Sequence, residues 1–472
     1  MAEHDLIVIG GGTAGLVTSA GAAGIGARVA LIEQDRLGGE CLWTGCVPSK
    51  ALIACARAAR ATCTAGRFGV HVPAASVDFG RVTQWVHEAQ QRIEPHDSPE
   101  RFRSLGVEVV RGTARFIGQR TLRVDSRVMS AKRVVIATGS KPAVPPIDGL
   151  SGVPFLTNET IFSLERQPET LLVLGAGPIG LELAQAFARL GTTVRVLEAA
   201  PQLLPREDEE LAKLLGQQLA AEEVEVLLDT TVTRVSREGR TIRLSARRGD
   251  GTPVMVEGDT LLVATGRVSN VALLETEKAG VQTAKSGVIV DERLRTTAGG
   301  VWAAGDVTGG PQFTHVADYQ ARLVVRNAFF PLGSKADYSV VPWVTFTDPE
   351  LAHVGLTERE ARDRHGDGVR VWQRPFGDVD RAIADGETSG MVKLVTDRRG
   401  KILGGHILGH GAGNMIAEVA LAMKHGIPAG KLGNTVHAYP TYPEAIKQAA
   451  EGYYKSRFRG PIRTIARWFA RR

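Results

Sequence analysis

The sequence predicts an α/β protein with two Rossmann-like dinucleotide-binding domains and a C-terminal α+β domain. Two segments, residues 4–34 and 170–200, follow the same design, and further apolar runs end in glycine. After about residue 340 these patterns stop, although more than a hundred residues remain. A chain of 472 residues is also too long for a single hydrophobic core. We therefore expect three structural regions.

The two similar segments read "HDLIVIGGGTAGLVTSAGAAGIGARVALIEQ" and "TLLVLGAGPIGLELAQAFARLGTTVRVLEAA". Each predicts a strand, a glycine turn, an Ala-rich helix and a second strand that ends in Glu. In such a unit the first glycine permits the tight turn, the second admits a pyrophosphate, the third lets helix pack on strand, and the acid binds ribose hydroxyls. These residues are, in order, Gly10, Gly12, Gly15 and Glu33 in the first segment and Gly175, Gly177, Gly180 and Glu198 in the second.

One such fingerprint is weak evidence, because ordinary glycine turns also match it. Two copies, each followed at the right distance by an acid, make ordinary turns a poor explanation. Two sites in one chain suggest two different dinucleotides. A flavin (FAD) beside a nicotinamide is the natural pair, because hydride passes readily between them.

Three further apolar runs have the same character. Residues 133–142 and 261–270 are predicted strands followed by Ala-Thr-Gly, and residues 299–310 contain a strand that leads to Gly305-Asp306. An Asp at such a strand end can accept hydrogen bonds from a polyol such as the ribityl chain of a flavin. Alone, Asp306 would more simply be a turn residue.

From about residue 340 the pattern predicts a third domain for packing, assembly or substrate binding. Thr357 and Glu360 have the spacing of a helix capping box. The stretch "GHILGHGAGNMIAEVALAMKHGI", residues 405–427, predicts one long amphipathic helix.

Charge and composition exclude several classes of protein. The net charge is +6, but residues 455–472 hold seven Lys or Arg and no acid, which leaves 50 basic and 51 acidic residues elsewhere. A nearly neutral body argues against nucleic-acid binding. The N-terminus lacks signal-peptide features and no apolar run is long enough to span a bilayer, so we expect a cytoplasmic protein. In the basic tail, Ile462, Ile465 and Phe469 have helical spacing, which suggests weak membrane-surface contact or simply a solvated tail.

All four cysteines fall in one short span, beginning with "GGECLWTGCVPSK" at residues 38–50. In a regular helix, Cys41 and Cys46 would be about 7.5 Å apart along the axis, too far for a disulfide. A bond between them requires irregular backbone, which the neighbouring glycines permit, and Pro48 suits the first turn of a following helix. Cys46 would then lie at a helix N-terminus, which stabilises a thiolate.

Two other interpretations of the cysteines stay open. A metal site is disfavoured because the spacing lacks the paired form of most zinc sites, and we expect no metal ligands. Cys55 and Cys63 lie in an Ala-rich helical stretch, where cysteine acts as a small hydrophobic residue. A redox-active pair is favoured over both metal binding and unpaired thiols.

The two fingerprints, "GGECLWTGCVPSK", "AAGDV" and the late "HAYPTYPEA" together resemble the flavoprotein disulfide reductases, which include mercuric reductase, dihydrolipoyl dehydrogenase and glutathione reductase. The resemblance extends to about residue 452. It implies FAD, NADH or NADPH, and a homodimer whose C-terminal domain completes the partner's active site. The implied regions are 1–149 and 269–338 (FAD and central), 150–268 (NAD(P)), 339–454 (dimerisation) and the tail 455–472.

The resemblance also implies roles for single residues. Cys46 is the thiol next to the flavin, Cys41 is the outer thiol that attacks substrate, and Lys50 with its partner Glu182 steadies charge as hydride arrives. The implied FAD contacts are Gly10, Gly12, Gly15, Glu33, Gly39, Lys50, Ala114, Thr138, Gly139 and Asp306; the implied NAD(P) contacts are Gly175, Gly177, Gly180, Glu198 and Gly266.

The chain departs from the family in "HAYPTYPEA". Disulfide reductases place an acid–base His before the proline, oriented by a Glu; here the residue is Tyr439, with Glu444 in register and His437 two positions earlier. A phenol with an ordinary pKa near 10 is a poor proton shuttle at neutral pH. A tyrosine at this position resembles mercuric reductase. Mercuric reductases, however, carry a cysteine pair near the C-terminus, and this sequence has no cysteine after Cys63. Soluble transhydrogenases share the Tyr-Pro but lack the cysteine pair.

These observations rank the electron acceptors. We expect a mercuric-reductase-like activity first, dihydrolipoyl dehydrogenase or another disulfide reductase second, and a quinone-reducing diaphorase third. A redox-sensing binding protein is the alternative outside enzymes. Glu198 favours the free 2′-hydroxyl of NADH, although Arg195 and Arg206 leave NADPH open.

Overall fold

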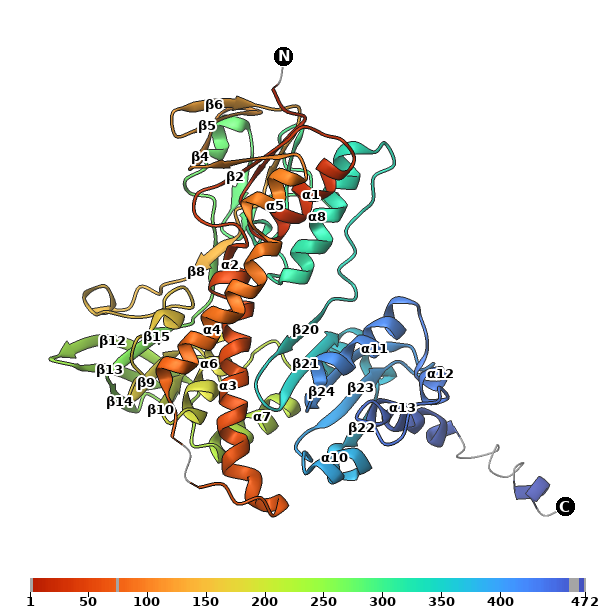
Figure 1. Ribbon diagram of the computed structural model, residues 1–472. Helices are drawn as coiled ribbons and strands as arrows, with labels where there is room; N and C mark the ends of the chain where they lie inside the picture. The colour runs from red at the N-terminus through yellow and green to blue at the C-terminus, as the bar shows by residue number, and fades with distance from the viewer. Residues whose placement is uncertain (1–2, 74–75, 458–466, 471–472) are drawn as a thin grey trace. The chain divides into compact units, whose positions relative to one another are not determined.

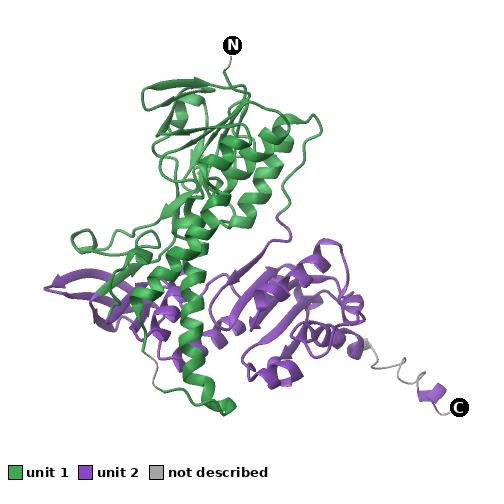
Figure 2. Cartoon of the chain, in the orientation of Figure 1, with its two compact units in different colours: residues 1–168, 260–337 green, residues 169–259, 338–472 purple. Residues whose placement is uncertain are grey.

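The computed structural model describes residues 3–73, 76–457 and 467–470. These residues form two compact units, shown in Figure 2. The first unit comprises residues 1–168 and 260–337, and the second comprises residues 169–259 and 338–472. Each unit is thus built from two separate stretches of the chain. The five regions expected from the sequence stay predictions.

A five-stranded parallel sheet is the centre of the first unit, in the order β19-β7-β1-β2-β3. Every residue of β1 is buried, as expected for a parallel strand covered on both faces. The long helices α1 and α8 lie side by side next to this sheet (Figure 1). The strands and helices are β1 (Leu6–Ile9), β2 (Val29–Glu33), β3 (Val107–Arg111), β7 (Val134–Ile136), β19 (Val301–Ala303), α1 (Thr13–Gly24) and α8 (Thr314–Phe329).

The rest of the first unit carries the cysteine segment and several small sheets. Helices α3 and α4 pack together, and β4, β5 and β6 form an antiparallel sheet. The remaining helices and strands are α2 (Gly39–Trp43), α3 (Cys46–Thr64), α4 (Phe79–Ile93), α5 (Pro99–Ser104), β4 (Ala114–Gly118), β5 (Thr121–Val124), β6 (Arg127–Ser130), β8 (Ser140–Pro142), β15 (Thr260–Val263), β16 (Arg267–Ser269), β17 (Thr283–Ala284) and β18 (Gly287–Val288). The three apolar runs predicted as glycine-ended strands therefore contain β7, β15 and β19.

The second unit begins with the second strand–helix–strand repeat. Strands β11, β10 and β9 pair in parallel, and β12, β13 and β14 form an antiparallel sheet. The segments are β9 (Thr170–Leu174), α6 (Pro178–Arg189), β10 (Thr193–Leu197), α7 (Glu209–Ala221), β11 (Glu225–Leu227), β12 (Thr230–Glu238), β13 (Thr241–Arg248) and β14 (Pro253–Gly258). The order β9-α6-β10 reproduces β1-α1-β2, which confirms the internal repeat.

An antiparallel sheet in the order β20-β21-β24-β23-β22 dominates the C-terminal part of this unit. Helices α11 and α13 contribute apolar side chains to its buried core, as Val419 and Ile446 do. The segments are β20 (Pro342–Thr345), β21 (Glu350–Gly355), α9 (Glu358–His365), β22 (Arg370–Pro375), α10 (Asp380–Asp385), β23 (Met391–Thr396), β24 (Ile402–Gly409), α11 (Ala412–Lys424), α12 (Ala429–Gly433) and α13 (Glu444–Arg457).

One prediction in this region was confirmed and one was wrong. Thr357 and Glu360 form the capping box at the start of α9. Residues 405–427, however, are not a single helix, because Gly405–Gly409 completes β24 and α11 starts only at Ala412. Strand β24 is almost wholly buried, and a fully buried apolar run does not distinguish strand from helix by its periodicity.

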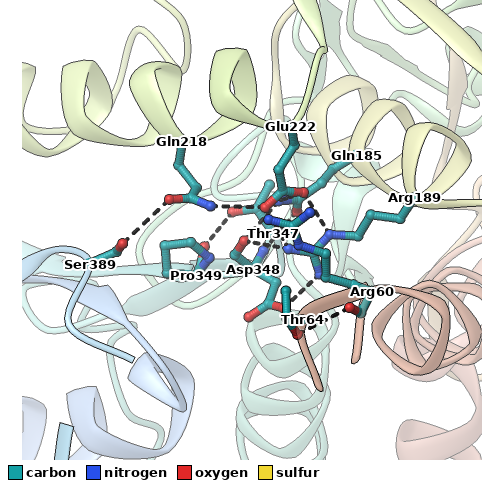
Figure 3. Close-up of polar contacts among 10 residues, drawn as sticks. All are labelled: Arg60, Thr64, Gln185, Arg189, Gln218, Glu222, Thr347, Asp348, Pro349 and Ser389. Atoms are coloured by element: carbon teal, nitrogen blue, oxygen red, sulfur yellow. Dashed lines mark hydrogen bonds and ion pairs between the residues drawn. The ribbon is translucent and has the colours of Figure 1, made fainter. Parts of the chain in front are cut away.

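A buried ion-pair network joins the two stretches that make up the second unit (Figure 3). The Arg189 side chain, 6% exposed, donates to both carboxylate oxygens of Glu222 at 2.7 and 2.8 Å and to Asp348 Oδ2 at 2.6 Å. The Gln185 amide donates to the Asp348 carbonyl and accepts from its N–H, both at 2.8 Å. The network thus fixes the end of α6 to the turn between β20 and β21.

Within the described residues, no helix is long and apolar enough to cross a membrane. Of the tail residues singled out in the sequence, Ile462 and Ile465 lie outside the described part of the chain. Membrane-surface contact by the tail therefore stays a prediction.

Candidate active site

The first glycine loop forms where β1 meets α1. Gly10 has φ +108°, and a Cβ there would lie 2.3 Å from the Ala137 carbonyl oxygen. A Cβ on Gly15 would lie 1.8 Å from the Gly10 carbonyl oxygen, so the first turn of α1 rests directly on the loop. Both positions therefore require glycine, as the fingerprint predicted.

Gly12 and Gly39 lie against each other, which brings the cysteine segment to the same loop. A Cβ on Gly39, where φ is +57°, would lie 2.6 Å from the Gly12 Cα. Gly12 is the residue before α1, so backbone N–H groups of the first helical turn are directed out of the loop. This arrangement suits the pyrophosphate of a dinucleotide.

The second glycine loop repeats this geometry in the second unit. Gly175 has φ +105°, and a Cβ on Gly180 would lie 2.0 Å from the Gly175 carbonyl oxygen. No heavy atom of the described chain lies within 4 Å of a Cβ placed on Gly177, the residue before α6. That open face, at a helix N-terminus, fits the pyrophosphate of a nicotinamide dinucleotide.

The two terminal acids hold their loops in the same way. Glu33 accepts hydrogen bonds from the N–H groups of Gly11 at 2.6 Å and Asp35 at 2.8 Å. Glu198 accepts from the N–H groups of Ala176 at 2.7 Å and Ala200 at 2.8 Å. Each carboxylate can accept about four hydrogen bonds, so ribose hydroxyls can still be bound.

The backbone around the cysteine pair is irregular, as a reactive pair at this spacing requires. Helix α2 contains Cys41 and ends at Trp43, and α3 begins at Cys46 after Gly45, whose φ and ψ are −129° and −109°. Cys41 is partly buried and Cys46 is exposed, and neither forms a disulfide here. A hydrogen bond with the Cys46 sulfur and burial raise the pKa of the Cys41 thiol.

A second helix N-terminus also meets Cys46. Thr314 is the first residue of α8, and its hydroxyl Oγ1 lies 3.4 Å from Cys46 Sγ. Helices α3 and α8 therefore both begin at this sulfur, and their dipoles favour a thiolate. Only the first of these two helix N-termini was predicted from the sequence.

The expected FAD contacts in the rest of the first unit lie near the ends of strands. Ala114 begins β4 and is buried, and Thr138 follows β7, where its hydroxyl donates to the Asn270 carbonyl at 2.6 Å. Gly139 has φ +68° and open space on its Cβ side. Asp306 accepts from the Ser140 hydroxyl at 2.6 Å. The glycine loop and the open face at Gly139 fit a flavin dinucleotide.

Sequence reasoning missed an ionic cluster beside the cysteines. Glu40 pairs with Arg267 and accepts from the Asn158 amide at 2.9 Å, and Arg267 lies 3.7 Å from Asp306. Burial, with smaller contributions from Asp306 and Cys46, raises the pKa of Glu40 to about 7. Its neighbour Arg267 opposes this shift. Only the position of Glu40 next to Cys41 could have drawn attention to it.

Of the remaining expected site residues, Lys50 and Gly266 belong to the first unit and Glu182 to the second. The Lys50 ammonium lies 3.4 Å from the Ser49 hydroxyl in the first unit. Glu182 is buried in the second unit and accepts from the Phe346 N–H at 2.8 Å. Gly266 has φ +134° and belongs to the first unit. Pairing of Lys50 with Glu182 and contact of Gly266 with NAD(P) stay predictions.

The late aromatic motif is exposed in the second unit. Tyr439 is 69% exposed, and its hydroxyl donates to Asp380 at 2.8 Å, which raises the pKa of the phenol. The His437 ring lies 2.8 Å from Glu418 and 3.0 Å from the Thr435 carbonyl. Glu444 begins α13. His437 therefore already has two partners, and a catalytic role for Tyr439 and Glu444 stays a prediction.

Comparisons with known proteins agree with this geometry. Residues 4–321 match the family described as pyridine nucleotide-disulphide oxidoreductase, and residues 341–450 match its dimerisation domain. The chain is 36% identical to a mercuric reductase from Streptomyces lividans, over 95% of this chain and 96% of that protein. It is also 36% identical to a dihydrolipoyl dehydrogenase from Thermus scotoductus, over 96% and 98% of the two chains.

A solved structure is also similar throughout. It is the Cu(II) complex of RclA, an HOCl-induced flavoprotein disulfide reductase from Escherichia coli, with a TM-score of 0.86 and 30% identity. The match covers 96% of this chain and 99% of that one. Members of the family use FAD and NAD(P)H. The chain belongs to the pyridine nucleotide-disulphide oxidoreductase family and is an FAD-dependent oxidoreductase.

Proposed function

We propose that this chain is a homodimeric, NADH-preferring flavoenzyme that reduces a thiolate-binding metal ion, with Hg(II) as the first candidate, through Cys41 and Cys46. The observation that carries the proposal is Tyr439, which stands where disulfide reductases need an acid–base histidine. A metal ion that binds thiolates needs no such histidine, because its reduction breaks no sulfur–sulfur bond of the substrate.

The cysteine pair supplies two sulfurs for a soft cation. The loop of Gly10, Gly12 and Gly15 would hold FAD, and the hydride chemistry of this cofactor would bring two electrons from NADH to the cysteine pair. In the reduced pair, the Cys41 thiol proton is hydrogen-bonded to Cys46 and is released when the cation binds both sulfurs. Overall, one NADH and one Hg(II) give NAD⁺, Hg(0) and one proton, with two electrons transferred.

The relatives are compatible with both leading candidates. Mercuric reductases and dihydrolipoyl dehydrogenases both cover nearly the whole chain, so overall identity does not separate the two activities. The copper complex of the similar Escherichia coli reductase makes Cu(II) a second metal probe. Dihydrolipoyl dehydrogenase remains the second candidate because its relatives are equally similar.

Acceptor profiling tests the proposal. Purified holoenzyme is assayed for NADH oxidation with Hg(II)-thiol complexes, Cu(II), lipoamide, low-molecular-weight disulfides and quinones, beside Tyr439→His and Tyr439→Phe. We expect the wild type to prefer a metal ion. Because a placed acid–base group contributes about 10²–10⁴-fold, Tyr439→His should raise lipoamide turnover by at least about 10-fold and Tyr439→Phe should not. A wild type that prefers lipoamide refutes the proposal.

The coenzyme preference follows from Glu198 and its surroundings. A carboxylate at this position accepts hydrogen bonds from ribose hydroxyls and repels a 2′-phosphate. Arg195, the nearest candidate for a phosphate partner, is paired with Glu225 at 2.9 Å and lies 3.3 Å from the Glu257 carbonyl. We expect kcat/KM to be higher for NADH; a clear preference for NADPH contradicts this.

A further inference from the structure

Three ligand-type side chains meet in the interior of the second unit, and no proposed step of the reaction uses them. Glu207 lies in the segment between β10 and α7, and His353 and His406 are directly paired residues on the neighbouring strands β21 and β24. They are 5%, 1% and 0% exposed. One ligand atom of each lies within 4.8 Å of the others.

The hydrogen bonds determine which ring nitrogens carry protons. His353 Nε2 faces the Gly355 carbonyl at 2.9 Å, and His406 Nε2 faces the Leu356 carbonyl at 3.0 Å. A carbonyl oxygen only accepts, so each Nε2 must carry hydrogen. In the neutral form of each ring, Nδ1 is then the atom with the lone pair.

In the described part of the chain, neither Nδ1 lone pair faces a hydrogen-bond donor. His353 Nδ1 lies 3.0 Å from Glu207 Oε2, so a neutral imidazole and a carboxylate would place two lone pairs against each other. Within the described residues, His406 Nδ1 has no partner at all.

A single proton shared between His353 Nδ1 and Glu207 would remove the repulsion between their lone pairs, but it would not satisfy His406 Nδ1. The buried nitrogen of His406 would stay unsatisfied, at a cost of about 1–3 kcal/mol. A divalent cation among the three groups satisfies both nitrogens and the carboxylate together.

The outer contacts resemble those that orient metal ligands. Ligating histidines usually donate their second N–H to a carbonyl or carboxylate, as both do here. The other oxygen of Glu207 accepts from Trp343 Nε1 at 2.5 Å, and the Trp343 ring stacks on His353 with centroids 3.8 Å apart. All three side chains are thus held in place by further partners.

We propose that Glu207, His353 and His406 bind one structural divalent cation of the zinc class. Two imidazoles and one carboxylate form a ligand set that Zn²⁺ accepts, with bonds of about 2.0–2.2 Å. The nearby Lys393 ammonium is neutralised by Asp208, Glu210 and Glu358 at 2.8–3.0 Å, so it does not oppose the cation. The ion would link the segment before α7 to the sheet of β21 and β24. This inference does not depend on the proposed reaction.

The test removes the thiols first, since they also bind zinc. Full-length holoenzyme carrying Ser at Cys41, Cys46, Cys55 and Cys63 is treated with chelator and titrated with Zn²⁺, and bound metal is measured by mass spectrometry. We expect one zinc ion per chain and a higher melting temperature. Glu207→Gln keeps the size of the side chain and should weaken binding at least 100-fold. Glu210→Gln, beside Lys393 but outside the three ligands, should bind as the parent does.

A spectroscopic measurement keeps the test independent of whether Glu207→Gln folds. X-ray absorption of the zinc-loaded thiol-free protein should show nitrogen and oxygen ligands with scattering from two imidazoles. A protein that retains no zinc and shows no thermal shift overturns the proposal. Equal binding in Glu207→Gln, or a spectrum without imidazole, means an adventitious ion only and also overturns it.

Discussion

Replacing Arg189 by Met should destabilise the second unit strongly. The guanidinium is 6% exposed and pairs with the Glu222 carboxylate, which is 3% exposed, through two hydrogen bonds (Figure 3). Methionine fills similar space but removes both hydrogen bonds that the Arg189 guanidinium gives to the buried Glu222 carboxylate. Removing one partner of a buried pair costs about 3–5 kcal/mol, most of it for the charge left behind.

This cost converts into a measurable change in melting temperature. For a unit of this size, 1 kcal/mol corresponds to about 2–4 °C, so the midpoint should fall by roughly 6–20 °C. The assay is thermal unfolding of FAD-loaded protein followed by circular dichroism, at one scan rate and one protein concentration.

Two matched variants make the result interpretable. Arg195→Gln breaks the pair with Glu225, whose members are 36% and 51% exposed, and should cost no more than about 1 kcal/mol. The double variant Arg189→Met/Glu222→Met removes both buried charges and should recover much of the loss. If Arg189→Met loses no more stability than Arg195→Gln, the interpretation of this network as a desolvated ion pair is refuted.

Three other predictions concern the loops and the cluster beside the cysteines. Gly15→Ala should abolish tight FAD binding, because the new Cβ would lie 1.8 Å from the Gly10 carbonyl oxygen. Gly24→Ala is the control: it has open space around it and should bind FAD normally. Flavin content after gel filtration measures both variants, and a flavin-loaded Gly15→Ala would contradict the loop geometry. Burial raises the pKa of Glu40 from 4.5 to about 7, so its ionisation lowers the folding stability of the wild type progressively between these pH values and by the full amount above pH 7. Glu40→Gln has no such ionisation and should therefore gain stability relative to wild type as the pH rises. Melting midpoints of the two proteins at pH 5 and pH 8 test this sign, and a difference that shrinks at pH 8 would contradict it. Glu198→Gln should reduce the preference of kcat/KM for NADH over NADPH, and an unchanged ratio would show that Glu198 does not contact the ribose.

Local patterns in the sequence were sufficient for the repeated units and the cysteine pair. The spacing of Gly10, Gly12 and Gly15 encodes close backbone contacts, which leave little choice of residue. The irregular backbone around Gly45 was expected because a bond between Cys41 and Cys46 would require it. These features are local, so a single sequence contains most of the information about them.

The features that were missed depend on contacts between distant segments. The approach of Thr314 to Cys46, and of Arg267 to Glu40, joins parts of the chain more than two hundred residues apart. His353 and His406 meet only because β21 and β24 pair in one register. Strand β24 was mistaken for helix because nearly all of its residues are buried, which removes the alternation that identifies a strand.

In the proposed reaction, electrons reach the acceptor through Cys41 and Cys46. One comparison of variants tests this path most directly. NADH oxidation with the best acceptor is measured for wild type, Cys41→Ser and Cys63→Ser, the last removing an exposed thiol in the same helical region. Loss of an essential nucleophilic thiol should reduce kcat by at least about 100-fold in Cys41→Ser, with Cys63→Ser unchanged. Full activity of Cys41→Ser on that acceptor would contradict the proposed electron path.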